Sequence, residues 1–189
     1  GNARFAQGVV VEGGELRVDG NLTGASVTIA KGGRVSGNGT ITANVTSYGT
    51  LSPGQSPGLM TINGNLTLAS GSRTTIEVDG PAAQVGAGGF DRILVSGSGR
   101  TAAVGGVLAP VLRGISGSAG NSFTPSLGAG FRFLEVADGR VTGSFSSLAQ
   151  PAAGLAANTR FDVVYGASSL TLAATPASYA NLAAFGVAQ

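Results

Sequence analysis

A chain of 189 residues with 42% hydrophobic and 11% charged residues is apolar enough to fold and lacks the highly charged composition of disordered proteins. Its 11 basic residues are spaced singly among 9 acidic ones, which excludes a basic patch that could neutralise nucleic-acid phosphates. Cysteine is absent, so no disulfide supports the fold, and no apolar run reaches the roughly 18 residues of a transmembrane helix.

Short β-type segments follow one another through residues 1–113, and each ends at Gly, Asn, Asp or Ser. Apolar residues alternate in them with Thr, Ser, Arg or Asn, and this period of two is typical of strands with one buried face. Turn signals about every 8 to 12 residues suit a sandwich, a barrel or a solenoid. We predict strands at Leu16–Val18, Val27–Ile29, Thr40–Val45, Met60–Ile62, Leu66–Leu68, Thr75–Val78, Arg92–Val95 and Val107–Val111.

An internal repeat favours the solenoid among these folds. The segment Val18–Thr23 (VDGNLT) is echoed by Ile62–Thr67 (INGNLT), and Gly37–Thr42 is a looser relative. The separation of the first two copies equals two coils of about 22 residues, within the usual range of solenoid repeats. Asn and Gly at the corners would tolerate the positive φ of sharp bends. We predict a solenoid, with a β-sandwich as the alternative.

From about Gly114 onward the composition changes. Residues Ile115–Leu127 are rich in Ser, Gly, Ala and Pro and predict a loop. Further strands are predicted at Phe131–Val136, Val141–Phe145, Phe161–Tyr165 and Leu170–Leu172. The ring-bearing residues on these strands predict the core of a cap that closes one end of the stack: Phe131, Phe133, Phe145, Phe161 and Tyr165. After Pro176, helical spacing predicts the start of a helix through Tyr179, Leu182, Ala183 and Gly186.

Two groups of residues resemble bacterial autotransporter passengers. Gly49–Gly58 (GTLSPGQSPG) and Met60–Leu68 (MTINGNLTL) are similar to the LSPGxSPGxLTINGNLT stretch of that family. The second group follows in the family's order: Gly89–Gly97, Gly105–Leu108, Phe131–Leu134, Gly143–Phe145 and Phe161–Tyr165. The resemblance covers roughly residues 30 to 189. Its family motif turn consists of Leu51, Ser52, Pro53, Gly54, Ser56, Pro57 and Gly58.

This resemblance implies the C-terminal part of a passenger exported by type V secretion. The expected fold is all-β, a right-handed parallel β-helix with an aromatic-rich C-terminal cap. Residues 1–113 would form the coils, 114–175 the cap or autochaperone region, and 176–189 the start of a linker towards a translocator barrel. The expected function is a structural stem and folding nucleus, displayed at the bacterial cell surface or secreted through the periplasm and outer membrane.

The resemblance also implies partners. They are the protein's own translocator barrel, the outer-membrane assembly machinery during transit, and host surface molecules; we expect a monomer. The chain does not open with a basic stretch and an apolar core, so it has no signal-peptide pattern and is expected to be an internal fragment of an exported protein.

Gly54–Gly58 (GQSPG) fits the GxSxG pattern, in which a serine nucleophile lies on a sharp turn between a strand and a helix. The chain has no histidine to act as the base, and no helical pattern follows. Pro57 lacks the N–H that an oxyanion hole requires directly after the serine. We therefore interpret the segment as a proline turn without a catalytic residue.

Two further motifs predict structure rather than ligand binding. Gly86–Ile93 comes near the calcium nonapeptide, but one imperfect copy cannot build a site that successive turns share. The single lysine, Lys31, stands outside any phosphate-binding pattern. We predict no metal and no cofactor. Asn suits corners and Thr suits strands, so we predict a structural role for the Asn-x-Thr triplets that begin at Asn21, Asn38, Asn44 and Asn65.

Carboxylates on one face of a solenoid would be needed to cleave a polysaccharide. The candidates all lie at turns or strand edges, where we expect them to be solvated: Glu15, Glu77, Asp79 and Asp91. We predict that the chain is not an enzyme. Two alternatives stay open, namely an adhesin surface of Thr, Ser and Asn that binds host glycans or proteins, and a polysaccharide-cleaving enzyme that depends on Glu77 or Asp91.

Overall fold

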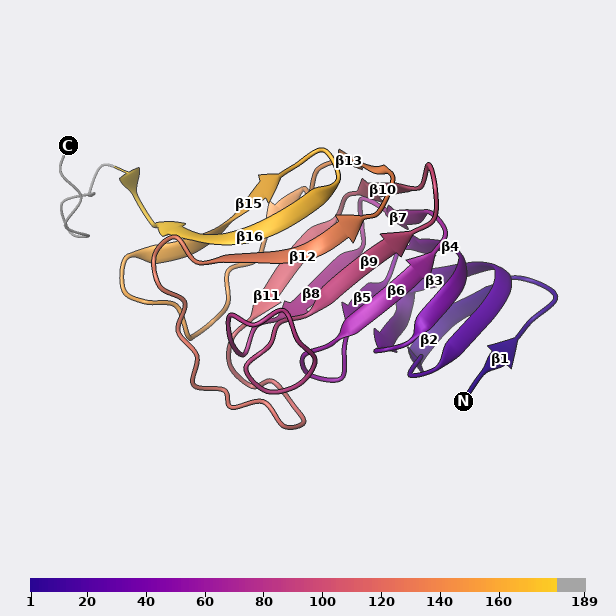
Figure 1. Ribbon diagram of the computed structural model, residues 1–189, viewed down its shortest axis with the longest axis horizontal. Helices are drawn as coiled ribbons and strands as arrows, with labels where there is room; N and C mark the ends of the chain where they lie inside the picture. The colour runs from indigo at the N-terminus through magenta and orange to yellow at the C-terminus, as the bar shows by residue number, and fades with distance from the viewer. Residues whose placement is uncertain (180–189) are drawn as a thin grey trace.

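The computed structural model describes residues 1–179, which form an all-β fold, as predicted (Figure 1). In this part of the chain 16 strands join in a single sheet that winds into a nearly closed, solenoid-like body. Among these residues no helix has the length and apolar character needed to cross a membrane. The helix predicted after Pro176 falls largely on residues 180–189, outside the described residues.

Every predicted strand overlaps an observed one, and four short strands were missed: β1, β5, β10 and β14. The first eleven strands are β1 (Ala3–Arg4), β2 (Val9–Arg17), β3 (Asn21–Gly37), β4 (Thr40–Ser47), β5 (Thr50–Pro53), β6 (Leu59–Asn63), β7 (Leu66–Leu68), β8 (Arg73–Glu77), β9 (Arg92–Ser96), β10 (Thr101–Val104) and β11 (Val107–Val111). The last five are β12 (Gly130–Val136), β13 (Arg140–Gly143), β14 (Ser147–Leu148), β15 (Thr159–Tyr165) and β16 (Ser169–Pro176).

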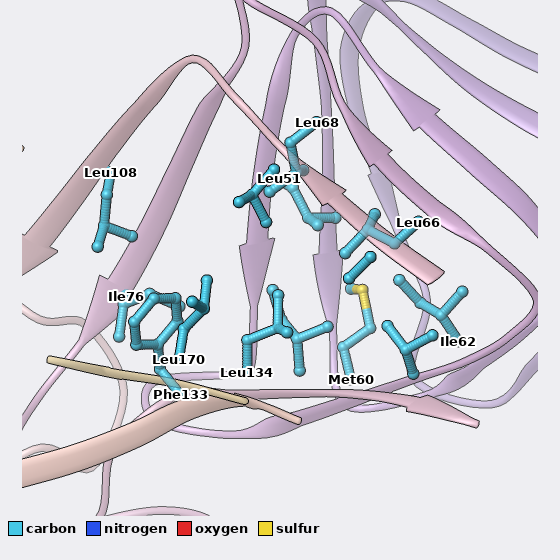
Figure 2. Close-up of a cluster of buried hydrophobic side chains, with 14 of the residues drawn as sticks. Leu51, Met60, Ile62, Leu66, Leu68, Ile76, Leu108, Phe133, Leu134 and Leu170 are labelled. Atoms are coloured by element: carbon cyan, nitrogen blue, oxygen red, sulfur yellow. The ribbon is translucent and has the colours of Figure 1, made fainter. Parts of the chain in front are cut away.

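Aliphatic side chains stack from coil to coil along the interior. Leu22 pairs with Ile41, Ile41 with Ile62, Ile62 with Val95, and Val95 with Val136, always between parallel strands. All five side chains are buried. Figure 2 shows part of this interior, where side chains from several strands meet in one continuous cluster. Because each coil covers the apolar face of its neighbour, the stack as a whole supplies the core.

The coils at the start of the chain are shorter than predicted. Val27 pairs with Val45 and Leu22 pairs with Ile41. The number of residues between partners in successive coils is therefore smaller than the repeat indicated. The two copies of the repeated motif consequently lie in different stacks. Leu22 of the first copy is in register with Ile41, whereas Leu66 of the second copy pairs with Val45. The motif therefore reports the local chemistry of a corner and not the length of two coils.

Asparagines at the corners bind the next coil through their side chains. The backbone N–H of Asn65 donates to Oδ1 of Asn44 (2.9 Å), and the N–H of Thr101 donates to Oδ1 of Asn65 (3.0 Å). In the same way the N–H of Gln55 donates to Oδ1 of Asn38 (3.1 Å). None of these asparagines has a positive φ, so that part of the prediction is wrong. Asn is used here because its short amide accepts a backbone N–H that the corner would otherwise leave unpaired.

The C-terminal end of the sheet changes from parallel to antiparallel pairing. Strand β12 pairs in parallel with β9 on one side and antiparallel with β16 on the other, and β16 forms an antiparallel hairpin with β15. The side chain of Gln150 covers part of the outer strand: its Oε1 accepts the N–H of Phe161 (2.8 Å) and its Nε2 donates to the carbonyl of Phe161 (2.9 Å). A covered edge resists the addition of further strands.

One buried hydroxyl interrupts an aliphatic stack. Thr74 pairs with Leu51 on one side and Leu108 on the other, and its Oγ1 finds no hydrogen-bond partner within residues 1–179. Replacing Thr74 with valine is expected to raise the free energy of unfolding by about 1–2 kcal/mol, because valine keeps the shape and removes an unpaired polar atom. Urea denaturation measures the change. The matched control is Thr75→Val at the neighbouring half-exposed position, where no gain is expected; an equal gain there would contradict the explanation.

Candidate functional site

The aromatic residues predicted for the cap largely meet in the core at the C-terminal end of the sheet. Phe131, Phe133 and Phe161 are at most 1% exposed, and Phe145 is buried near the rim. Figure 2 shows Phe133 among Ile76, Leu108, Leu134 and Leu170, which come from β8, β11, β12 and β16. The cap therefore joins residues that lie far apart in the sequence.

Tyr165 is the exception among the predicted cap residues. It is 44% exposed, so the prediction that its ring lies in the core is wrong. Tyr165 is the last residue of β15, where the strand leaves the core and turns towards β16. Its hydroxyl oxygen accepts the backbone N–H of Phe145 (3.1 Å), which ties the strand end to the segment after β13.

Two phenylalanines that the sequence pattern did not place in the cap pack against its central ring, Phe131. Phe90 and Phe123 both contact Phe131 edge to face, with ring centroids 5.5 and 6.0 Å away. Phe161 makes the third such contact at 6.1 Å. Both missed residues lie in segments rich in Gly and Ser, where no period of two marks a buried face. The signal that could have found them is a lone aromatic residue in an otherwise small and polar loop.

The family motif turn is packed against the sheet rather than projecting from it. Leu51 lies in the core, and Ser52, Pro53, Ser56, Pro57 and Gly58 are also buried. Gly54 has a φ of +96°, and a Cβ there would collide with Oδ1 of Asp91. A Cβ on Gly58 would collide with Oδ1 of Asn38. Both glycines are thus required by the close approach of polar side chains from neighbouring coils.

Asp91 anchors this turn. It is 0% exposed, so the prediction of a solvated acid is wrong. Its Oδ1 accepts the N–H of Gly58 (2.7 Å) and its Oδ2 accepts the N–H of Glu77 (2.9 Å), which links the motif turn to the end of β8. Burial raises the pKa of Asp91 well above its usual value, the nearby charge of Glu77 raises it further, and the two N–H donors oppose this shift.

A polar pocket of about 200 Å³ lies beside the turn, lined by Glu15, Arg34, Ser52, Ser56, Glu77 and Ser116 among others. Nε of Arg34 donates to Glu15 (3.2 Å) and its Nη2 donates to Oγ of Ser52 (3.0 Å). Burial raises the pKa of Glu77, against the effects of a hydrogen bond from Ser56 and the charge of Arg34. A hydrogen bond from Ser36 and the charge of Arg34 lower the pKa of Glu15, although desolvation opposes them. Glu15 and Glu77 are thus the acids that line the pocket.

Asp91 and Ser56 are both engaged in structural contacts in this arrangement. Both oxygens of Asp91 are occupied by backbone donors, and this acid cannot reach a substrate. Ser56 has a φ of +62° and its Oγ lies 2.9 Å from Oγ of Ser116. Pro57 follows it and offers no N–H for an oxyanion. Within residues 1–179 no group of three or more potential ligands could hold a metal ion.

Asp79 is also buried, at 6% exposed, and its predicted solvation is wrong. It does not line the pocket with Glu77 and Glu15. Its carboxylate instead accepts backbone N–H groups from two long loops, at Gly88, Gly120 and Asn121. Asp79 and Asp91 therefore both organise backbone, a role that the residue types alone did not indicate.

No protein-family model matches this chain, and no curated protein matches it.

Proposed function

We propose that this chain forms the rigid stem and folding nucleus of a secreted passenger of the autotransporter type. The proposed architecture is a right-handed parallel β-helix closed by an aromatic C-terminal cap. Three features support it: the parallel pairing of successive coils, the buried aliphatic stacks, and the antiparallel hairpin at the C-terminal end. The resemblance of Gly49–Leu68 to passenger sequences supplies the cellular setting, display at the bacterial surface after passage through the outer membrane.

The observation that carries the proposal is the dense packing at the C-terminal end of the stack. At the C-terminal end, Phe131 touches three other rings and the outer strand is covered by Gln150. Coils in a parallel stack are stable only on a formed neighbour. The dense end is thus the place where folding starts.

Folding from this end would assist export. Once a nucleus has formed outside the membrane, the coils that emerge after it would add to it one by one. Each folded coil would then prevent the chain from sliding back through the membrane. The translocator barrel and the outer-membrane assembly machinery are the partners that this proposal requires. It requires no catalytic residue, cofactor or metal.

Refolding kinetics test the position of the nucleus with two matched leucines. Leu172 lies in the hairpin strand β16 and Leu22 in β3, and both are buried. Each change to alanine is expected to cost about 2–5 kcal/mol. Leu172→Ala should mainly slow refolding, because its contacts form in the transition state, whereas Leu22→Ala should mainly speed unfolding. Stopped-flow refolding from urea gives both rates. Slower refolding of Leu22→Ala with an unchanged refolding rate for Leu172→Ala would contradict the proposal.

A further inference from the structure

Two long loops lengthen the later coils and lie together on one side of the molecule. In the stack Ile62 is followed by Val95 and Val95 by Val136, and both steps along the chain are much longer than the step from Leu22 to Ile41. The loop between β8 and β9 and the loop between β11 and β12 contribute much of this extra length; both project below the strands in Figure 1. Residues 114–127 of the second loop are called the strap below.

The carboxylate of Asp79 joins the two loops. Its Oδ2 accepts the N–H of Gly88 (2.9 Å) from the first loop and the N–H of Gly120 (2.8 Å) from the strap. Its Oδ1 accepts the N–H of Asn121 (2.7 Å). Three short bonds to one ionised acceptor are stronger than bonds between neutral groups. The strap itself contains no charged residue, so the charged groups that hold it lie outside it, at Asp79 and Arg113.

The strap is folded on itself around Asn121. This residue has a φ of +55°, its Oδ1 accepts the N–H of Ile115 (2.8 Å), and its Nδ2 donates to the carbonyl of Ile115 (2.8 Å). Arg113 donates to the carbonyl of Phe123 and, at 3.1 Å, to Oγ1 of Thr124. The predicted loop is therefore an ordered unit with its own internal hydrogen bonds.

The strap lies against the aromatic cap and makes both apolar and polar contacts. Phe123 packs edge to face on Phe131, and Ile115 and Pro125 are buried. Ser116 shares a hydrogen bond with Ser56 at the rim of the polar pocket (2.9 Å). No residue of the strap belongs to a strand of the sheet. The polar contacts at Asp79 and Arg113 therefore hold the strap in place together with these apolar contacts and without any strand pairing.

We propose that the strap is a latch that the Asp79 carboxylate closes over the aromatic cap, and that it opens separately from the strands when this carboxylate is neutralised. The device is independent of the proposed stem function. It exposes Phe123 and one face of Phe131 in the open state while the stacked coils remain paired.

The direction of the pH dependence follows from the pKa of Asp79. Burial alone would raise this pKa, but the N–H groups of Gly88, Gly120 and Asn121 and the charge of Arg113 together lower it below its usual value. Arg113 is the charged group that faces it, and neither the strap nor residues 80–90 carry another. Because the pKa of Asp79 is lower in the closed state, the ionised carboxylate stabilises closure at a pH above the usual pKa. This stabilisation is lost as the pH falls through the lowered pKa. The latch therefore opens in acid.

Amide hydrogen exchange followed by mass spectrometry tests the latch. In Asp79→Asn at neutral pH, peptides that cover Gly120 and Asn121 should exchange at least about tenfold faster, with peptides from β3, β4 and β6 unchanged. Asn121→Gly, which keeps the positive φ but loses the side-chain bonds to Ile115, should accelerate the same peptides. The control Asp138→Asn removes one charge from a turn outside both loops and should change nothing.

Exchange that speeds up equally in the strap and the strands of Asp79→Asn would overturn the proposal, because opening would then be global unfolding. Unchanged exchange in the strap would overturn it as well. In the wild type, strap exchange corrected for the intrinsic pH effect should rise as the pH falls below about 4, and Asp79→Asn should have lost that rise.

Discussion

Replacing Phe131 with alanine is expected to lower the free energy of unfolding by about 3–5 kcal/mol. Phe131 is 1% exposed and lies at the centre of three edge-to-face contacts, with Phe90, Phe123 and Phe161. Its removal leaves a cavity that these rings cannot fill without giving up their own packing. Urea denaturation at neutral pH measures the loss.

The matched control for this prediction is Phe5→Ala. Phe5 is the same residue type but is exposed in the first coil, so its loss should change the stability by less than about 0.5 kcal/mol. A cost for Phe131→Ala no larger than that of the control would show that the ring cluster does not support the C-terminal end.

Replacing Asp91 with alanine is the second large effect, an expected loss of about 2–4 kcal/mol. The change leaves the N–H groups of Gly58 and Glu77 without their acceptor in a site that water does not reach. Each unpaired buried donor costs about 1–3 kcal/mol, and the loss of the buried charge offsets part of that. The control is Asp19→Ala, where a half-exposed carboxylate pairs with Arg17 and little change is expected.

The cost of Asp91→Ala should also depend on pH. Burial and the charge of Glu77 place the pKa of Asp91 well above the usual 3.8, so the folded state binds the proton more tightly than the unfolded state. The group therefore stabilises the fold most below the unfolded pKa, and this contribution is lost as the pH rises through the folded value. We expect a larger cost near pH 3 than near pH 7 in parallel urea titrations. A cost that grows with pH would mean that the ionised form is the stabilised one.

The acids were the least predictable part of the candidate site. Asp79 and Asp91 follow strands or glycine-rich segments, a context in which an acid is ordinarily solvated. Their burial depends on backbone N–H groups of Gly58, Gly88 and Gly120, which lie in other loops and coils. Residue propensities depend on neighbours along the chain and therefore do not predict donors that come from other loops and coils.

The amino-acid sequence by itself determined the character of the core and all the described strands except β1, β5, β10 and β14. Period-two alternation marks one buried face on each short segment, because successive side chains of a strand point to opposite sides. The same rule placed Phe131, Phe133 and Phe161 in the interior. The sequence also shows that the motif turn contains glycines. The structure explains why glycine is needed there: a side chain at Gly54 or Gly58 would collide with a neighbouring coil.

Only the tertiary structure decided the coil length, the exposure of Tyr165, the packing of Phe90 and Phe123 on Phe131, and the burial of Asp79 and Asp91. The physical reason is common to all of them. A coil is stabilised by the coils above and below it, so register and burial depend on residues that lie one whole coil away along the chain. The local sequence pattern indicates which face of a strand is apolar. The residues that cover this face are determined by the tertiary structure of the whole stack.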